Sequence, residues 1–276
     1  MAETADSNGL PPFQHLRAVH VIDAMATFGQ DRLERLGLPR AFLLAALAGG
    51  FITLGGLLSI LLPVGIAADG LVRLVEGFAF SAGFFFVVLS EAVLFTEANV
   101  VLPATLLKSD RPARKVAAFW ATAWIGNLTG AIATGELVMW AQSYPDASLE
   151  MLRHVIDLKL QYWREGGAQA WLQVVGSGVL ANWLVGMAAF FGMMGRTIFG
   201  KFIPISLAVT LFVAANFQHS PANMGYFALL HAHGDGAGWP VALVWNIVPA
   251  GIGNVIGAAV LVTIPFWFVF RTAARR

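Results

Sequence analysis

Residues 94–99 read Leu94-Phe95-Thr96-Glu97-Ala98-Asn99, and residues 217–223 read Phe217-Gln218-His219-Ser220-Pro221-Ala222-Asn223. Each stretch places polar residues inside a long apolar segment. Lipid cannot hydrogen-bond the backbone groups that a broken transmembrane helix exposes, so such a break persists only inside protein or beside a polar cavity. Paired breaks in the two halves of a chain indicate a substrate path near the bilayer midplane. The two stretches therefore predict a pore.

The composition is that of an integral membrane protein. Of 276 residues, 58% are hydrophobic and 12% are charged, against roughly 25% charged residues in a soluble domain. Cysteine is absent, which excludes a disulfide framework, a thiolate nucleophile and a cysteine-ligated metal centre. We expect a lipid bilayer as the surroundings, with no cofactor, no metal and no nucleic-acid partner.

Six apolar runs are long enough to cross about 30 Å of hydrocarbon. They lie at about 41–62, 71–95, 116–141, 168–195, 202–231 and 241–270. The second run continues beyond its break as a half-helix to Leu107, and the fifth contains the second break. The sequence thus predicts an all-α membrane transport domain over 41–270 with six transmembrane helices, of which helices 2 and 5 are broken.

The positions of Lys and Arg predict the orientation in the membrane. Cytoplasmic flanks of membrane spans carry an excess of these residues, and with the N-terminus inside, 13 of the 17 fall on the inner side. Residues 1–40 then form a cytoplasmic segment whose amphipathic pattern fits a surface-lying helix or a collar packed on the protein. Residues 271–276 form a cytoplasmic tail. We expect a multi-pass protein of the inner (cytoplasmic) membrane.

An internal repeat indicates two related halves. Ile125-Gly126-Asn127-Leu128-Thr129-Gly130-Ala131 recurs 127 residues later as Ile252-Gly253-Asn254-Val255-Ile256-Gly257-Ala258. Ala98-Asn99 after the first break is likewise echoed by Ala222-Asn223 after the second. Because each half holds three spans, an odd number, the halves must enter the membrane from opposite sides as inverted repeats. The alternative is convergence on small residues where helices pack.

Four strings in the chain resemble the formate/nitrite transporter family. They are Glu91-Ala92-Val93-Leu94-Phe95-Thr96, Ala181-Asn182-Trp183-Leu184-Val185, Phe217-Gln218-His219-Ser220-Pro221-Ala222-Asn223-Met224 and Ile252-Gly253-Asn254. The resemblance covers about residues 20–270. It implies an aquaporin-like protomer, a homopentamer with one pore in each protomer, and conduction of small monovalent weak-acid anions such as formate, nitrite or hydrosulfide.

The same resemblance implies roles for individual residues. By this resemblance, the hydrophobic gates of the family correspond to Leu94, Phe95 and Phe212. The hydroxyl donor corresponds to Thr96 and the central histidine to His219. The polar residue that faces the histidine corresponds to Asn182. The expected pore lining also includes Asn99 and Asn223.

The chain departs from the family pattern at two positions. Gln218 stands where the family usually has Glu, and Gly166 stands where it usually has a lysine in the outer vestibule. Lys159 or Arg164 are candidate replacements for that lysine, but neither is in register.

Moving a bare anion from water into a low-dielectric constriction costs tens of kcal/mol nominally, before the protein supplies any compensating interactions. Imidazole titrates near neutral pH, so we hypothesise that His219, hydrogen-bonded to Asn182 or Thr96, lends a proton to the anion between two gates. Each residue also has a purely structural alternative. His219 could hydrogen-bond carbonyl groups of its own loop, and Thr96 and Asn182 could hydrogen-bond backbone groups that the breaks leave free. The gate residues could serve as packing residues.

Two other classes of function remain open. An aquaporin-like pore would pass water or small neutral solutes, although the paired Asn-Pro-Ala signatures of that class are missing. A membrane enzyme would use His219, His231 and His233 with buried glutamates. In a pore, Glu97 would disfavour anions near the inner mouth unless it is protonated or paired with Lys108 or Arg111. A metal site at His231-Ala232-His233-Gly234-Asp235 is disfavoured against a solvated turn. We expect a transporter rather than an enzyme.

Overall fold

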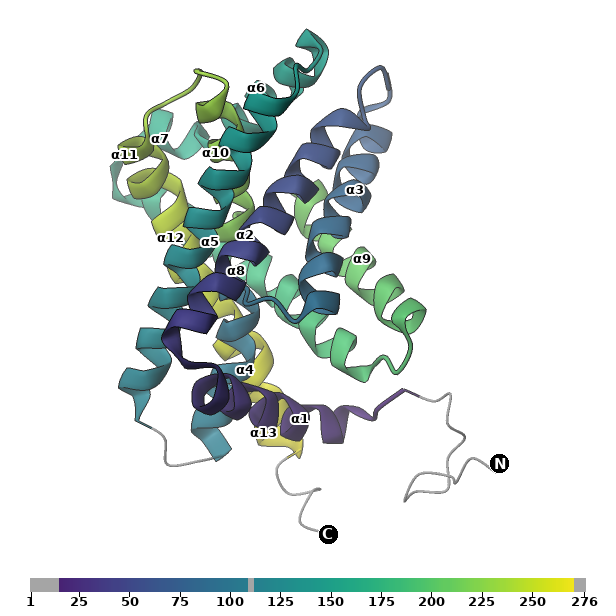
Figure 1. Ribbon diagram of the computed structural model, residues 1–276, viewed down its shortest axis with the longest axis vertical. Helices are drawn as coiled ribbons and strands as arrows, with labels where there is room; N and C mark the ends of the chain where they lie inside the picture. Colours follow the sequence, from purple (N-terminus) through teal and green to yellow (C-terminus); the bar gives the residue numbers. More distant parts are fainter. Residues whose placement is uncertain (1–14, 109–111, 271–276) are drawn as a thin grey trace.

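The computed structural model describes residues 15–108 and 112–270, and all regular secondary structure in these two ranges is helical (Figure 1). The helices are α1 (Ala18–Asp31), α2 (Gly37–Leu61), α3 (Asp69–Ser90), α4 (Phe95–Lys108), α5 (Ala113–Ala141), α6 (Asp146–Lys159), α7 (Gln161–Glu165), α8 (Gly167–Met194), α9 (Ile198–Ala214), α10 (Ser220–Ala232), α11 (Trp239–Ala242), α12 (Val248–Ala258) and α13 (Ile264–Phe270). Short π-helical turns join α1 to α2, α11 to α12 and α12 to α13.

Membrane-length helices dominate the bundle. Within the described residues, five helical stretches are long and apolar enough to cross a bilayer, and they begin at Ala18, Asp69, Ala113, Gly167 and Trp239. α9 is also apolar, but its 17 residues fall short of the roughly 20 that a crossing needs. The predicted all-α membrane fold is confirmed, whereas the count of six spans stays a prediction.

Both predicted breaks are present, slightly earlier than the sequence placed them. α3 ends at Glu91, where φ is 54°, and α4 begins at Phe95. α9 ends before Asn216, where φ is 55°, and α10 begins at Ser220. Within the described ranges, these are the two non-glycine residues with left-handed backbone. Thr96 and Glu97 lie in the first turn of α4, whereas Gln218 and His219 lie in the loop just before α10.

The two interrupted helix ends close in the same way. The Ala92 N–H donates to the Val87 carbonyl at 3.1 Å, and the Phe217 N–H donates to the Phe212 carbonyl at 3.0 Å. Such bonds satisfy carbonyl groups that a helix end leaves free. From the breaks, α4 and α10 run toward opposite ends of the molecule (Figure 1). We call the end with α6, α7 and α11 the outer end and the end with α1 and α13 the inner end.

Asn127 on α5 holds the first break. Its Oδ1 accepts the Phe95 N–H at 2.9 Å, and its Nδ2 donates to the carbonyls of Ala45 at 2.8 Å and Val93 at 3.0 Å. The side chain is fully buried. One amide group therefore satisfies two backbone groups at the α4 end of the break and ties the break to α2.

Asn254 on α12 holds the second break in the same manner. Its Oδ1 accepts the Ser220 N–H at 2.9 Å, and its Nδ2 donates to the carbonyls of Gly178 at 2.9 Å and Gln218 at 3.1 Å. Convergence on small packing residues does not account for two asparagines that make equivalent bonds to equivalent breaks. The Gly-Asn repeat therefore marks two structurally related halves.

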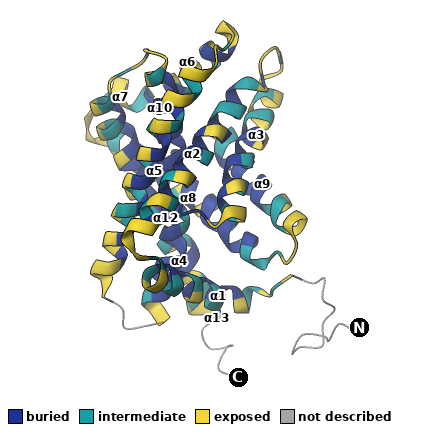
Figure 2. Ribbon diagram, viewed as in Figure 1, coloured by how far each residue is buried: buried dark blue, intermediate teal, exposed yellow. Residues whose placement is uncertain are grey.

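Glycines in the repeat bring the neighbouring helices close to these asparagines. A Cβ added at Gly130 would lie 1.8 Å from the Ala46 carbonyl oxygen of α2, and one at Gly257 would lie 2.2 Å from the Val179 carbonyl oxygen of α8. Only glycine allows this approach without displacing a backbone. The α5–α2 and α12–α8 pairs thus form a frame around the central half-helices, where residues 220–230 of α10 are all buried (Figure 2).

α1 packs across the inner end of the bundle. Its buried residues Val21, Ile22 and Met25 belong to a hydrophobic cluster with α4, and α1 also contacts α8 and α13. Asp23 accepts a hydrogen bond from Lys108 at 2.7 Å. This packing matches the collar alternative for residues 15–40. The remainder of the expected N-terminal segment, 1–14, and the expected tail, 271–276, lie outside the described residues.

We predict that Asn254→Ala lowers the stability of the fold by at least about 2 kcal/mol. The substitution leaves the Ser220 N–H and the Gln218 carbonyl buried without a partner, and each unsatisfied group costs about 1–3 kcal/mol. Thermal unfolding of the detergent-solubilised protein measures the effect. Thr129→Ala is the control, because the Thr129 hydroxyl is exposed and bonds only the Ile125 carbonyl of its own helix. Equal unfolding temperatures for the two variants would refute the role of Asn254.

Candidate functional site

His219 and Thr96 join the two breaks at the centre of the molecule. His219 precedes α10 and is 1% exposed, and Thr96 lies in the first turn of α4. The His219 Nε2 lies 2.9 Å from the Thr96 Oγ1, while the Nδ1 accepts the Ala222 N–H at 3.2 Å. Because Nδ1 accepts, the hydrogen of the neutral ring is on Nε2 and is donated to Thr96. The hydroxyl hydrogen of Thr96 is then left to point toward another acceptor.

Asn182 lies beside this pair but does not contact the histidine by a hydrogen bond. Its Nδ2 donates to the carbonyls of Thr96 at 3.3 Å and Asn254 at 2.8 Å. Its Oδ1 is buried and has no hydrogen-bond partner among the described residues. Of the two partners expected for His219, the geometry therefore selects Thr96. Asn182 hydrogen-bonds backbone carbonyl groups, which is the structural alternative named for it in the sequence.

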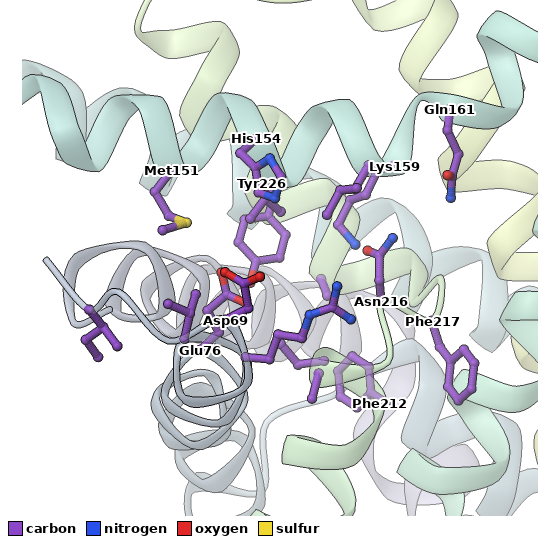
Figure 3. A pocket seen from close by; sticks show the side chains of 18 residues that line it. Asp69, Glu76, Met151, His154, Lys159, Gln161, Phe212, Asn216, Phe217 and Tyr226 are labelled. Atoms are coloured by element: carbon purple, nitrogen blue, oxygen red, sulfur yellow. The ribbon is translucent and has the colours of Figure 1, made fainter. Parts of the chain in front are cut away.

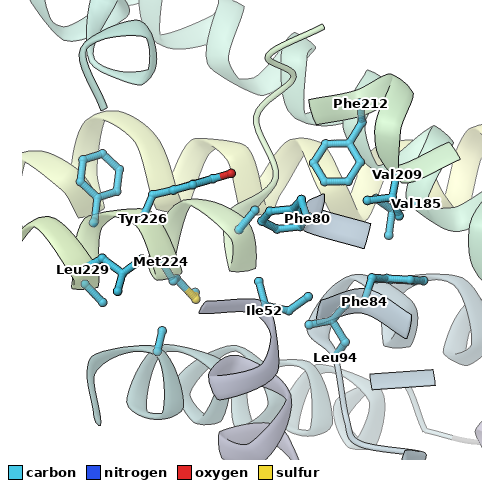
Figure 4. Packing of buried hydrophobic residues seen from close by; sticks show 14 of the residues in the cluster. Ile52, Phe80, Phe84, Leu94, Val185, Val209, Phe212, Met224, Tyr226 and Leu229 are labelled. Carbon is cyan, nitrogen blue, oxygen red and sulfur yellow. The ribbon is translucent and has the colours of Figure 1, made fainter. Parts of the chain in front are cut away.

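The expected gate residues are buried on both sides of the His219–Thr96 pair. Phe212 stacks against the His219 ring, with centroids 5.2 Å apart, and meets Phe80 edge-on at 5.8 Å. Leu94 belongs to the same apolar cluster as Phe212, on the first break (Figure 4). Phe95 belongs to the inner cluster that also contains residues of α1. Apolar side chains thus enclose the polar pair, as gates or as packing residues would.

A cavity of about 570 Å³ opens at the outer end above Phe212 (Figure 3). Its charged and titratable lining residues are Asp69, Arg73 and Glu76 of α3, His154 and Lys159 of α6, and Tyr226 of α10. Its floor includes Phe212, Asn216 and Phe217, which belong to α9 and the second break. The cavity therefore ends one aromatic ring away from His219.

Lys159 is one of the two candidate replacements for the vestibule lysine, although it does not align with that position in the sequence. It lines the cavity, is 5% exposed, and places its Nζ 5.4 Å from the centre of the Tyr226 ring. Burial lowers the pKa of the Lys159 ammonium to about 8, although the carboxylate of Glu76 acts in the opposite direction. Arg164, the other candidate, is exposed and bonds Asp157.

Gly166 shows why no lysine occupies the position that the family pattern suggests. Its φ is 70° at the start of α8, a backbone conformation that a non-glycine residue adopts only at a cost. A buried cationic group comes instead from Lys159 at the end of α6, seven positions earlier in the chain. Sequence register alone could not find it, because α6 and α7 form a bend between Lys159 and α8.

A buried amide cluster connects Lys159 to the second break. Gln218 Oε1 accepts from Asn223 Nδ2 and Asn246 Nδ2, each at 3.0 Å, and Asn246 Nδ2 also donates to the Lys159 carbonyl at 3.0 Å. Gln218 thus uses its neutral side chain as an acceptor at the position of the usual glutamate. Sequence reasoning missed Asn246 because its only signal is a single polar residue in an apolar helix.

Two of the expected pore residues keep unpaired polar atoms. The Oδ1 of Asn223 and both side-chain polar atoms of Asn99 are buried without a hydrogen-bond partner among the described residues. Buried polar groups are nearly always paired, so an unpaired one requires an explanation such as a water or a ligand. These atoms and the Oδ1 of Asn182 fit the expectation of a polar path on both sides of His219.

The remaining charged groups that the sequence singled out are engaged in ion pairs. Glu97 lies 3.8 Å from Arg32, which is a different partner from the expected Lys108, and the other expected partner, Arg111, lies outside the described residues. At the outer end, Asp235 accepts from Arg153 at 2.6 Å, and the His231 ring packs on Trp239.

Comparison with known proteins identifies relatives over most of the chain. The sequence pattern of the formate/nitrite transporter family matches residues 19–268. A probable formate transporter of Methanothermobacter thermautotrophicus is 29% identical over 252 residues, which cover 86% of this chain and 91% of the relative. The formate channel FocA of Escherichia coli K12 is 28% identical over 255 residues, which cover 84% and 86% of the two chains.

The fold is also found among solved structures. A pentameric formate channel with formate bound superposes with a TM-score of 0.70 at 22% sequence identity, covering 85% of this chain and 98% of that one. At this level of identity, the similarity establishes the fold alone.

Proposed function

Because the chain belongs to the formate/nitrite transporter family, we propose that it is a membrane channel for small monovalent weak-acid anions of the formate, nitrite or hydrosulfide type. The observation that carries the proposal is the buried His219–Thr96 hydrogen bond, which joins the two helix breaks between apolar side chains. The names of the relatives, a formate transporter and a formate channel, support formate as a first substrate. The family is one of transporters, and we propose no enzymatic activity.

We also propose the assembly and location expected from the sequence. A homopentamer is supported by the name of the pentameric formate channel whose protomer has the same fold. A multi-pass location in the inner membrane, with both termini cytoplasmic, is supported by the excess of Lys and Arg at the inner end. In this orientation the charged cavity faces outward.

The geometry supports a stepwise path for an anion. The Lys159 ammonium attracts an anion into the outer cavity, since a charged group in a low-dielectric cleft raises the local concentration of counter-ions. Phe212 separates this cavity from His219. Beyond it, the Thr96 hydroxyl, which already accepts from the His219 Nε2–H, donates its own hydrogen to the anion. Preorganised donors of this kind replace part of the lost hydration.

Proton lending by His219 is part of the proposal, under a condition that the geometry sets. An imidazolium donates from both ring nitrogens, whereas Nδ1 accepts the Ala222 N–H at 3.2 Å. The ring can therefore bind a second proton only when that contact opens. Proton transfer to the anion then accompanies a local movement at the start of α10.

Uptake into proteoliposomes tests the proposed function. We predict that formate, nitrite and hydrosulfide enter vesicles that contain the protein faster than empty vesicles, and that acetate and neutral solutes enter more slowly. Apolar gates reject larger solutes by size, and the charged cavity favours anions. Osmotic water flux that is fast and independent of external pH, with no anion uptake, would favour the aquaporin-like alternative.

We predict that His219→Phe lowers anion flux at least about tenfold and flattens its dependence on pH between about 5 and 8. Phe keeps the ring that packs on Phe212 but removes both the donor to Thr96 and the titratable nitrogen. Thr96→Val is the matched variant, because it removes only the hydroxyl at nearly constant volume. Unchanged flux in His219→Phe across this pH range rejects the role of the histidine.

Lys159 gives a second pH dependence. Its ammonium is charged below its pKa of about 8, so its attraction for anions is present at neutral pH and is lost as the external pH rises through that value. We predict that the KM for anion uptake increases between about pH 7 and pH 9. In Lys159→Gln we expect KM to be severalfold higher at neutral pH and nearly constant over this range. A wild-type rise in KM that persists in Lys159→Gln contradicts the assignment.

A further inference from the structure

The outer cavity carries carboxylates as well as cations, although a site that only attracts anions would not require them. Within the described residues, its charged groups are Asp69, Arg73, Glu76 and Lys159, with His154 and Tyr226 as further titratable groups. Figure 3 shows Glu76, His154 and Lys159 directed toward the same space from α3 and α6. The amount and sign of charge in this cavity decide which anions concentrate there.

Glu76 is the carboxylate placed to act on Lys159. It interacts electrostatically with His154, Arg73 and Lys159, and it is partly buried, whereas Asp69 is exposed at the rim. Glu76 lies one helical turn from Phe80, whose ring contacts both Phe212 and Tyr226. The Glu76 carboxylate thus lines a less exposed part of the cavity than Asp69 does, and water screens a charge there less than at the surface.

The neighbourhood of Glu76 also fixes its position. The next residue, Gly77, packs so closely on Thr210 of α9 that an added Cβ would lie 2.6 Å from the Thr210 carbonyl oxygen. This contact holds the outer part of α3 against the helix that carries Phe212. The distance between the carboxylate and the gate is therefore set by rigid helix packing rather than by a flexible loop.

We propose that Glu76 is a specificity-determining residue of the outer cavity, whose carboxylate offsets the Lys159 ammonium and thereby favours monovalent over divalent anions. The inference rests on the proposed function as an anion channel. The physical reason is that the energy of an anion in the cavity is its charge multiplied by the local potential. A more positive cavity favours a divalent anion twice as strongly as a monovalent one, so a divalent anion would occupy the cavity and block it. Glu76 limits that potential while Lys159 still attracts a single negative charge.

Glu76→Gln tests the proposal by kinetics. Formate uptake is measured in proteoliposomes at about pH 6, where Lys159 stays protonated in the wild type and in the variant, with sulfate as the competing divalent anion. We expect the KM for formate to fall about threefold and the inhibition constant of sulfate to fall about ninefold, because the same change in potential acts on twice the charge. Both shifts should diminish as ionic strength rises. Asp69→Asn is the matched control, since it removes a carboxylate from the exposed rim and should change both constants much less.

A second readout does not depend on transport. The Glu76 carboxylate stabilises the Lys159 ammonium, so its removal is expected to lower the pKa of Lys159 further below about 8. Acylation of Lys159 by a water-soluble amine-reactive reagent can be followed by mass spectrometry as a function of pH. This pH profile should shift to lower pH in Glu76→Gln and not in Asp69→Asn. A correctly shifted profile also shows that the variant retains its folded cavity.

The outcomes separate this inference from the proposed function. If wild-type vesicles take up no anion, the proposed function is wrong. If the wild type conducts but Glu76→Gln leaves the ratio of the sulfate and formate constants unchanged, or changes it no more than Asp69→Asn, the role of Glu76 is wrong while the channel remains. An unshifted Lys159 profile likewise overturns the coupling between the two residues.

Discussion

The structure depends on the need to hydrogen-bond the backbone of two helices that stop inside the membrane. In hydrocarbon, an unpaired N–H or C=O group costs several kcal/mol. Asn127 and Asn254 meet this need with a short amide side chain, which offers an acceptor and two donors close together. Each asparagine bonds an N–H and a carbonyl at the end of its break and a carbonyl of the neighbouring helix. The breaks are therefore fixed features of the framework.

The rigidity of the breaks is what places the functional groups. Because the second break is held by Asn254, His219 stands at the start of α10 with its Nδ1 against the Ala222 N–H and its Nε2 against Thr96. Glycines at the α5–α2 and α12–α8 contacts bring the supporting helices near enough for this. A polar pair that joins both halves of the molecule forms only if both breaks are held within hydrogen-bond distance of each other.

Charge and apolar packing divide the proposed path into two environments. The outer cavity is polar, holds groups of both signs, and is linked to the second break through Asn246, which bonds both Gln218 and the Lys159 carbonyl. Below Phe212 the surroundings are largely apolar, and the polar groups there are buried side chains that include Thr96, Asn182 and His219. Electrostatic attraction thus acts in the outer cavity, where an anion first arrives from water. Directed hydrogen bonds act deeper, where the low dielectric constant makes each of them stronger.

The sequence by itself determined the membrane class, the two breaks, the repeat and the identity of the central His219 and Thr96, because hydropathy and polar interruptions in apolar runs are local properties of a chain. It did not determine which residue pairs with His219, why Asn127 and Asn254 recur, or that Lys159 supplies a buried cation to the outer cavity. These depend on contacts between segments that are far apart along the chain. Lys159 comes into position only through the bend that α6 and α7 make before α8, and Glu76 meets it from another helix. Tertiary packing alone decides such distances, since electrostatic and hydrogen-bond partners are selected in space and leave no fixed spacing in the sequence.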